Sequence, residues 1–429
     1  MQKLANTTTS MAARAVAEQD PPQWRLTMWA MVGVQIVMSC SFSFLSPIMP
    51  LFLPELGVHT ESAVDFWSGL LASVTSFVGV FTQPMWGRMA DTHGRKLMVL
   101  RSSLAISIFT ILMGFVTDVW QMLILRMLMG AFAGFSAASV VMVASSVPER
   151  RLGYALGVLS SGQLVGSLMG PLLGGGLADL TGSLRQPFYV AGTIGLAAFA
   201  LCWAFVPERF TKPKEKRQHA SWMASVRMIT RSRILVALVM VLLLTQFATQ
   251  AIQPVITLFV QELLGNRPDL GTLAGLAFSA AGLAGVLAVP VLGRGADRIG
   301  ERQVLLLALA GAALFTAPQA IVHGYWGFLL ERFGLGLFVG GIIPAANALI
   351  GKMTEASDRG FIYGTTASAY FLGNALGPLT GGAVGAAFGL RWVFVVTAAL
   401  LVAALAWVYV VVPTRAERGA QRTSGGRVG

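Results

Sequence analysis

The sequence predicts an all-α membrane protein with twelve transmembrane helices arranged as two parallel six-helix repeats. Three observations lead to this prediction. Apolar residues make up 55% of the 429 residues and charged residues only 12%, about half of the roughly 25% that a soluble domain carries. Apolar runs of membrane-spanning length recur along the whole chain. In addition, residues of the first half recur in the second half at a nearly constant offset.

Twelve apolar runs are long enough to cross a membrane. A bilayer core requires about 20 apolar residues per helix, and a backbone surrounded by lipid satisfies its hydrogen bonds within that helix. The runs lie near 26–53, 66–88, 97–116, 119–145, 153–177, 187–206, 234–261, 271–293, 303–322, 325–349, 360–386 and 390–413. We therefore expect a tail at 1–25, a six-helix half at 26–206, a basic linker at 207–233, a second half at 234–413 and a tail at 414–429.

The basic residues are distributed asymmetrically between these runs. If both termini lie on one side, 26 of the 31 Lys and Arg residues fall on that side. The other five are Arg126, Arg185, Arg267, Arg332 and Arg391. Because cytoplasmic segments are enriched in Lys and Arg, we expect a multi-pass protein of a bacterial-type inner membrane with both termini in the cytoplasm. The net charge of +12 then reflects orientation, and no nucleic-acid partner is expected.

The internal repeat includes charged residues and prolines as well as glycines. At an offset of 206, Gly87, Asp91 and Gly94 correspond to Gly293, Asp297 and Gly300. At an offset of 207, Gly170-Pro171 corresponds to Gly377-Pro378. Six helices return the chain to its starting side, so the two halves have the same orientation. Parallel repeats of this kind place a binding site between them near the middle of the membrane.

A charged turn joins the second and third spans, and a second copy joins the eighth and ninth. Glycines permit a tight turn with positive φ, and the acid and bases are placed to bond helix ends across a moving contact. A simple charged turn is the alternative, but its repetition favours a gate. The predicted gate residues here are Gly87, Asp91, Gly94, Arg95, Lys96, Gly293, Asp297 and Gly300.

The fifth span contains a glycine stripe with four-residue spacing, which includes Gly166 and Gly170. Small residues on one helix face let a neighbouring backbone pack closely, and Pro171 removes a backbone donor and bends the helix. Ordinary helix packing is the alternative. A second bend at Gly377-Pro378 in the eleventh span favours a shaped interface that moves.

Charged and polar residues inside the spans are candidates for coupling and binding. Arg126, Glu331 and Arg332 lie within apolar runs, where charges are costly and usually face a cavity or a partner. Snorkelling of Arg126 and a local pair between Glu331 and Arg332 are the alternatives. The predicted cavity residues are Gln35, Gln163, Gln246, Gln250, Gln253, Asn347, Tyr370 and Asn374. Each of them alone is also consistent with an interhelical hydrogen bond.

These motifs resemble those of a known family. The segments 87–96, 126–130 and 166–175 are similar to motifs A, B and C of the major facilitator superfamily, and motif C is associated with its drug:proton antiporter branch. The resemblance runs from the first span to the twelfth. It implies a monomer that exports amphipathic or cationic drugs in exchange for protons by alternating access. One feature departs from the pattern: the first span has no acid before Glu55, whereas several drug antiporters carry one there.

Other functions remain open at this point. The second interpretation, after drug export, is the export of one endogenous metabolite, such as a siderophore, and the third, which the Gly-Pro motif of the fifth span disfavours, is solute uptake by proton symport. A membrane-bound enzyme would need a catalytic cluster, and the HExxH, GxSxG and phosphate-loop patterns do not occur in the sequence. Cys40 and Cys202 lie in separate apolar runs without metal-ligand spacing. We therefore expect neither enzyme activity nor a cofactor or metal.

Overall fold

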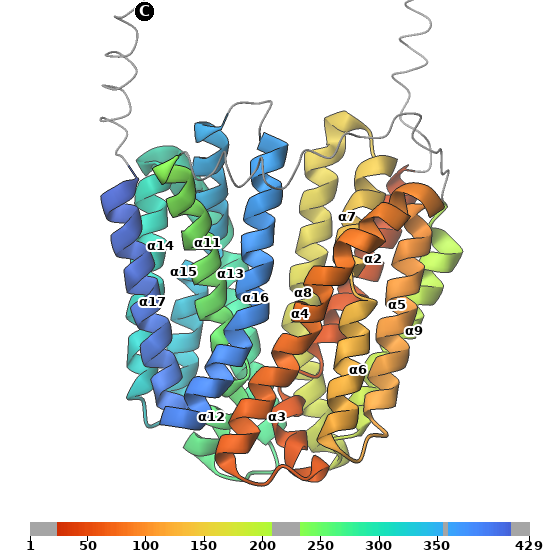
Figure 1. Ribbon diagram of the computed structural model, residues 1–429, viewed down its shortest axis with the longest axis vertical. Helices are drawn as coiled ribbons and strands as arrows, with labels where there is room; N and C mark the ends of the chain where they lie inside the picture. Colours follow the sequence, from red (N-terminus) through yellow and green to blue (C-terminus); the bar gives the residue numbers. More distant parts are fainter. Residues whose placement is uncertain (1–23, 208–231, 355–358, 413–429) are drawn as a thin grey trace, which may run out of the picture.

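The structure, a computed structural model, describes residues 24–207, 232–354 and 359–412. Within these ranges the regular structure is entirely helical, in two groups that stand side by side (Figure 1). The first group is α2 (Trp24–Ser43), α3 (Ile48–Phe52), η1 (Leu53–Leu56), α4 (Glu61–His93), α5 (Arg95–Met113), α6 (Val119–Ala131), α7 (Phe135–Ser146), η2 (Glu149–Arg151), α8 (Leu152–Thr181) and α9 (Gln186–Phe205). The second is α11 (Arg233–Ala251), α12 (Val255–Leu264), α13 (Leu270–Ile299), α14 (Glu301–Thr316), η3 (Ala317–Ala320), α15 (Tyr325–Met353), α16 (Arg359–Phe388) and α17 (Leu390–Val411).

The predicted fold class is confirmed. Eleven helical stretches of the described chain are long and apolar enough to cross a membrane. The remaining long helix, α16, has 30 residues and is therefore about 45 Å long at 1.5 Å per residue, more than a bilayer core requires. It packs against α4 and α11 inside the assembly. Glycines and polar residues such as Asn374 make it less apolar than the other spans.

The first, fourth and seventh spans are not the continuous helices that the sequence predicts. In the first, the chain turns after Ser43 and Pro47 precedes the short helix α3. The seventh breaks at the equivalent place, where Pro254 precedes α12. The fourth breaks at Gly134, whose φ of 115° is in the left-handed region that favours glycine. Counting apolar residues does not detect these breaks, because they depend on the missing donor of proline and the freedom of glycine.

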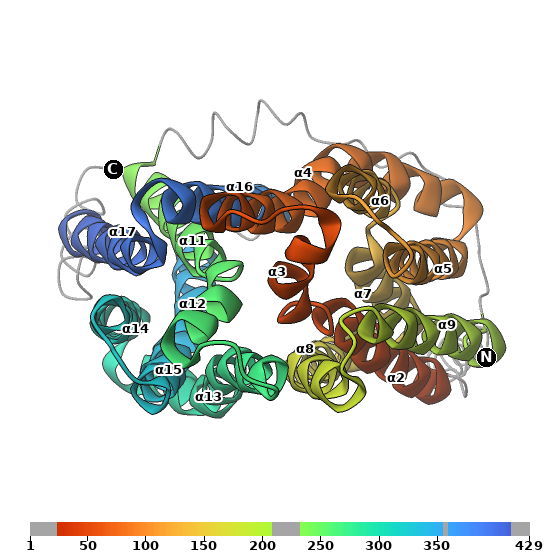
Figure 2. The same cartoon turned by 90° about the horizontal axis from the view of Figure 1, so that it is seen from below.

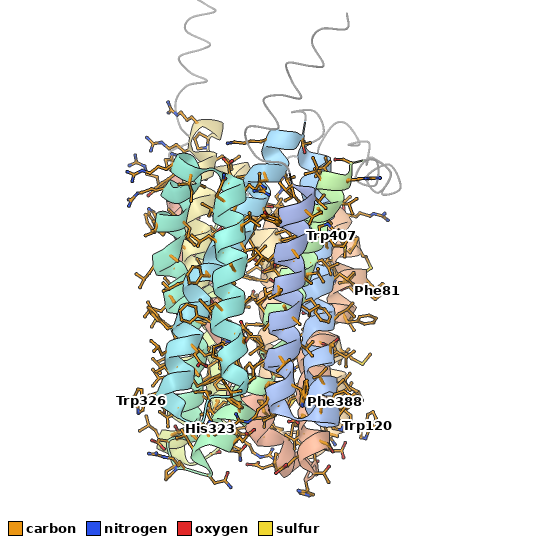
Figure 3. The ribbon with its side chains drawn as sticks, turned by 90° about the vertical axis from the view of Figure 1, so that its left-hand side faces the viewer. Phe81, Trp120, His323, Trp326, Phe388 and Trp407 are labelled. Atoms are coloured by element: carbon orange, nitrogen blue, oxygen red, sulfur yellow. The ribbon has the colours of Figure 1, made fainter. Side chains whose placement is uncertain are left out.

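The helical assembly has an inner side and an outer side. The inner side is where α9 ends and α11 begins, and the outer side is where α3 and α12 lie (Figure 1). Trp120, Trp326 and Phe388 are exposed near the outer side, and Trp407 lies toward the inner side (Figure 3). Exposed large apolar residues of this kind fit a surface that faces lipid, and Trp is typical of the membrane interface.

Each half has its own buried core, and the two cores repeat each other. In the first, the rings of Phe52 and Phe188 lie 5.1 Å apart between centroids. In the second, the rings of Phe259 and Phe394 lie 4.9 Å apart. Because these aromatic contacts join helices within one half, each half is packed as a unit of its own.

The repeat also holds for an ion pair at the outer side. Arg185 pairs with Glu55, with Nε and Oε2 3.4 Å apart, and its Nη1 donates to two backbone carbonyls. Arg391 pairs with Glu262, with Nε and Oε1 3.1 Å apart, and its Nη1 also donates to two carbonyls. All four residues are partly exposed, so each pair adds little stability. Their equivalence shows that the sequence repeat corresponds to a structural repeat.

The glycine stripe of α8 packs on the backbone of α2. A Cβ placed on Gly170 would lie 2.6 Å from the carbonyl oxygen of Cys40 and 2.8 Å from Cβ of Ser43. In the second half, a Cβ on Gly377 would lie 2.6 Å from the carbonyl oxygen of Phe247, on α11. Real Cβ atoms are not found at such distances, so both positions require glycine.

We predict that Gly170→Leu lowers the melting temperature of the purified protein and abolishes the transport expected from its motifs. Overpacking a tight interface costs about 1–3 kcal/mol, and here backbone atoms have to move. The matched control is Gly33→Ala on α2, where a Cβ would meet no atom within 4 Å. Thermal unfolding followed by intrinsic fluorescence checks this, and a Gly170→Leu protein as stable as the Gly33→Ala control would contradict the packing.

Candidate functional site

The two halves meet along two seams. One seam is formed by α4 and α16, and the other by α8 and α13. Figure 2, seen from the outer side, shows the four helices bridging the two groups, with α3 and α12 between them. Each seam therefore joins one helix of each half, and any space between the halves lies between the two seams.

Both seams are closed at the outer side. A Cβ placed on Gly69 of α4 would lie 2.8 Å from Cα of Gly382 on α16, and one on Gly271 of α13 would lie 2.8 Å from the carbonyl oxygen of Gly175 on α8. Toward the inner side, α4, α8 and α13 lack such contacts at their glycines. At Gly87, Gly153, Gly157 and Gly293, a Cβ would meet no described atom within 4 Å. The close backbone contacts between the halves are thus found on the outer side.

An aspartate reinforces the closed seam between α8 and α13. Asp179 accepts hydrogen bonds at Oδ1 from the backbone N–H of Gly271 (3.0 Å) and at Oδ2 from the N–H and hydroxyl of Thr272 (both 2.6 Å). Gly271 and Thr272 begin α13, so the carboxylate also faces the positive end of a helix dipole. This charge-assisted set of bonds connects the two halves directly.

The closed seams bound a central cavity of about 290 Å³. It is lined by residues from both halves, at the break between α2 and α3, at the break between α11 and α12, and on α4, α6, α13 and α16. The lining includes Phe42, Ser46, Ser68, Ser76, Arg126, Gln250, Gln253, Phe278 and Asn374. Polar side chains and apolar surface thus share the wall, and a small-molecule site uses such polar groups to fix the orientation of its ligand.

Asn374 is the centre of a polar network that spans the halves. Its Oδ1 accepts from Nε2 of Gln246 (3.4 Å) and from Nε2 of Gln250. Its Nδ2 donates to the hydroxyl of Ser76 on α4 at 3.3 Å. Residues from α11, α16 and α4 therefore share one set of hydrogen bonds at the wall of the cavity.

The structure places only part of the predicted cavity set at this cavity. Gln250, Gln253 and Asn374 line it, and Gln246 bonds to Asn374. The five residues of the predicted set that do not line it are Gln35, Gln163, Gln246, Asn347 and Tyr370. Gln35 is 2% exposed and donates to Ser39 of its own helix, and Gln163 accepts from Ser136. A polar residue in a span therefore does not by itself indicate the cavity, because many satisfy local partners instead.

The charges predicted to act in coupling occupy different environments. Arg126 lines the cavity, and its buried Nε has no acceptor among the described residues. Arg332, its repeat equivalent, is 4% exposed and donates through Nε to the carbonyl of Ala277. Glu331 does not line the central cavity, and its Oε2 is buried without a partner in the described chain. Glu331 and Arg332 do not form the local ion pair that was the alternative.

The segments predicted as charged turns, near 87–96 and 293–302, are mostly helical, and only their later glycines lie in a turn. Gly94 and Gly300 have φ of 101° and 96° and end α4 and α13, as expected for glycines in tight connections. Gly87 and Gly293, expected in the turn, lie instead within these helices, with no close neighbour. Lys96 donates from Nζ to the carbonyl of Trp203, which joins α5 to α9. The side chains of Asp91 and Asp297 lie outside the described residues.

Comparison with known proteins agrees with this architecture. The family model described as Major Facilitator Superfamily matches residues 31–271 and 243–427. The multidrug resistance proteins MdtG of Salmonella arizonae and Salmonella newport are each 38% identical over 361 residues, which cover 84% of this chain and 89% of theirs.

Solved structures of other transporters share the fold. The nucleoside transporter NupG superposes with a TM-score of 0.72 at 13% identity, covering 91% of this chain and 100% of its own. A bacterial homologue of the human lysosomal transporter Spinster gives 0.70 at 15% identity, covering 92% and 98%. The family model and the MdtG relatives each span most of the sequence, and the chain is thus a member of the major facilitator superfamily, an MdtG-like multidrug transporter.

Proposed function

We propose that this transporter exports small amphipathic compounds in exchange for protons by alternating access, with both termini on the cytoplasmic side. The observation that carries the proposal is the central cavity, which has walls from both halves and closed seams on its outer side, whereas the glycines toward its inner side lack close contacts. A compound bound there contacts both halves, so it is able to bias their relative position. The names of the MdtG relatives support drugs as the substrates.

The lining of the cavity favours neutral or anionic amphipaths over cations. Arg126 is the charged residue among the lining residues, and acids are missing from that set. A cationic drug would therefore enter a partly dry space beside a fixed positive charge, without a counter-charge to compensate it. An anionic group, by contrast, would find an arginine whose Nε lacks an acceptor in the described chain. Phe42 and Phe278 provide the apolar surface for the rest of the molecule.

Expression in a pump-deficient bacterial strain tests the proposed function. We predict raised resistance to several chemically unrelated neutral or anionic amphipaths, and loss of their efflux when a protonophore collapses the proton gradient. Resistance to one compound alone would favour a dedicated metabolite exporter. Efflux that persists with the protonophore while ATP is maintained would exclude proton exchange. Accumulation inside the cell in place of efflux would indicate symport.

We predict that Arg126→Ala weakens the binding of an anionic substrate by about 10–100-fold, because a hydrogen bond to a charged group contributes about 1.5–3 kcal/mol. Proton-driven export should be lost with it. A neutral analogue of the same shape is the matched ligand and should bind nearly as before. Calorimetry on purified protein separates the two ligands, and equal losses for both would show that the guanidinium does not select for charge.

A further inference from the structure

A second cavity opens at the outer side, next to the seam between α4 and α16. This outer vestibule has a volume of about 590 Å³ and is walled by α3, α4, α12, α16 and the start of α17. Pro50 lines both the outer vestibule and the central cavity. The polar residues of the vestibule are His59, Glu61, Ser62, Asp65, Gln261, Glu262 and Asn266.

Asp65 differs from the other acids on the outer side. It is 8% exposed, yet its side chain forms neither a hydrogen bond nor an ion pair with any residue in the described ranges. Glu55 and Glu262 pair with arginines, and Asp179 accepts three hydrogen bonds. Glu61 is exposed to solvent. Asp65 is therefore a largely buried residue whose carboxyl group has no partner in the described chain and lines a cavity open on the outer side.

The position of Asp65 places it in the seam itself. A Cβ on Gly382 of α16 would lie 2.6 Å from the backbone oxygen of Asp65, and a Cβ on Gly385 would lie 3.3 Å from its Oδ2. The carboxyl group is thus held against the glycine surface of α16, which has to separate from α4 if the outer side opens.

The described residues that line the outer vestibule include no lysine or arginine. The facing part of α16 is Gly382 to Ala386, which has no ionisable side chain. From α3 and η1 the neighbours in the vestibule are Pro50, Leu51 and Pro54. From α12 the neighbour is Glu262, whose charge is matched by Arg391 of α17. The remaining titratable groups are Glu61 of the same helix and His59 just before it.

We propose that Asp65 binds a proton from the outer side and that its neutral form stabilises the closed seam between α4 and α16. A hydronium ion in the outer vestibule transfers its proton to a carboxylate oxygen of Asp65, leaving water and a neutral carboxyl group. Burying an unpaired anion costs much more than burying a neutral group. An open seam hydrates Asp65 and favours the anion, whereas a closed seam favours the acid. The inference rests on the proposed proton exchange and identifies where the outer proton acts.

Distance measurements across the outer side test this proposal. Thr117→Cys and His323→Cys, both in exposed outer loops of opposite halves, carry spin labels in a Cys40→Ala, Cys202→Ala background, reconstituted in nanodiscs. The short distance between the labels corresponds to the closed outer side, and we expect its population to grow as the pH falls from 8 to 5. For the binding of one proton, the ratio of closed to open molecules rises by at most about tenfold per pH unit. Asp65→Asn, which is permanently neutral, should stay closed and lose this pH dependence.

Controls make each outcome decisive. Glu61→Gln neutralises an exposed acid of the same vestibule and should leave a pH response in place, whereas Asp65→Asn abolishes it. Asp65→Ser provides a second uncharged variant if Asp65→Asn does not fold. A wild-type distance that ignores pH, or an Asp65 variant that responds like wild type, would overturn the proposal. The distance measurement needs neither substrate nor a proton gradient, so its result is independent of the export assay. If export is proton-driven but the distance in Asp65→Asn changes with pH as it does in the wild type, the role of Asp65 is wrong and the proposed function still stands.

Discussion

The contact on which the structure depends is the close approach of backbones at the two outer seams. At Gly69 with Gly382, and at Gly175 with Gly271, side chains are absent and peptide groups of opposite halves touch. Such close packing is lost as soon as the two backbones move apart, so intermediate separations are unfavourable. We therefore expect each seam to be either closed or open, and in this structure the closed seams bound the cavity. A transporter needs such a two-state element, because a ligand shifts access only by binding one state better.

Hydrogen bonds between polar groups of the two halves also hold the seams closed. Asp179 connects α8 to the first residues of α13, and the network around Asn374 joins α16 to Ser76 of α4. Each seam thus combines a glycine contact with directed hydrogen bonds from the opposite half. In the proposed mechanism, a substrate that competes for Asn374, or a proton that changes the charge at a seam, acts on the same closure. Binding and gating would then be connected through a small set of residues.

The sequence predicted the architecture better than the site. The length of the apolar runs and the internal repeat predicted the spans, because a run surrounded by lipid satisfies its backbone hydrogen bonds only as a helix. The close packing of Gly170 was predicted from the four-residue spacing of the glycines. Asp65 and Asp179 were missed because they lie just beyond the predicted ends of their spans, and examining acids at span ends would have found them. The position of Gln35 was also unpredictable, since a polar side chain in a span is satisfied as well by its own helix, here through Ser39, as by a cavity.

The most direct test of this account is the accessibility of the central cavity from each side. Ser46→Cys, which lines the cavity, is labelled with an impermeant reagent in right-side-out and inside-out vesicles, with and without Gly382→Leu. Closed outer seams predict labelling from the inner side in the parent, and new labelling from the outer side when leucine separates α4 from α16. Equal outer labelling with and without Gly382→Leu would contradict the glycine contact as the element that closes the transporter.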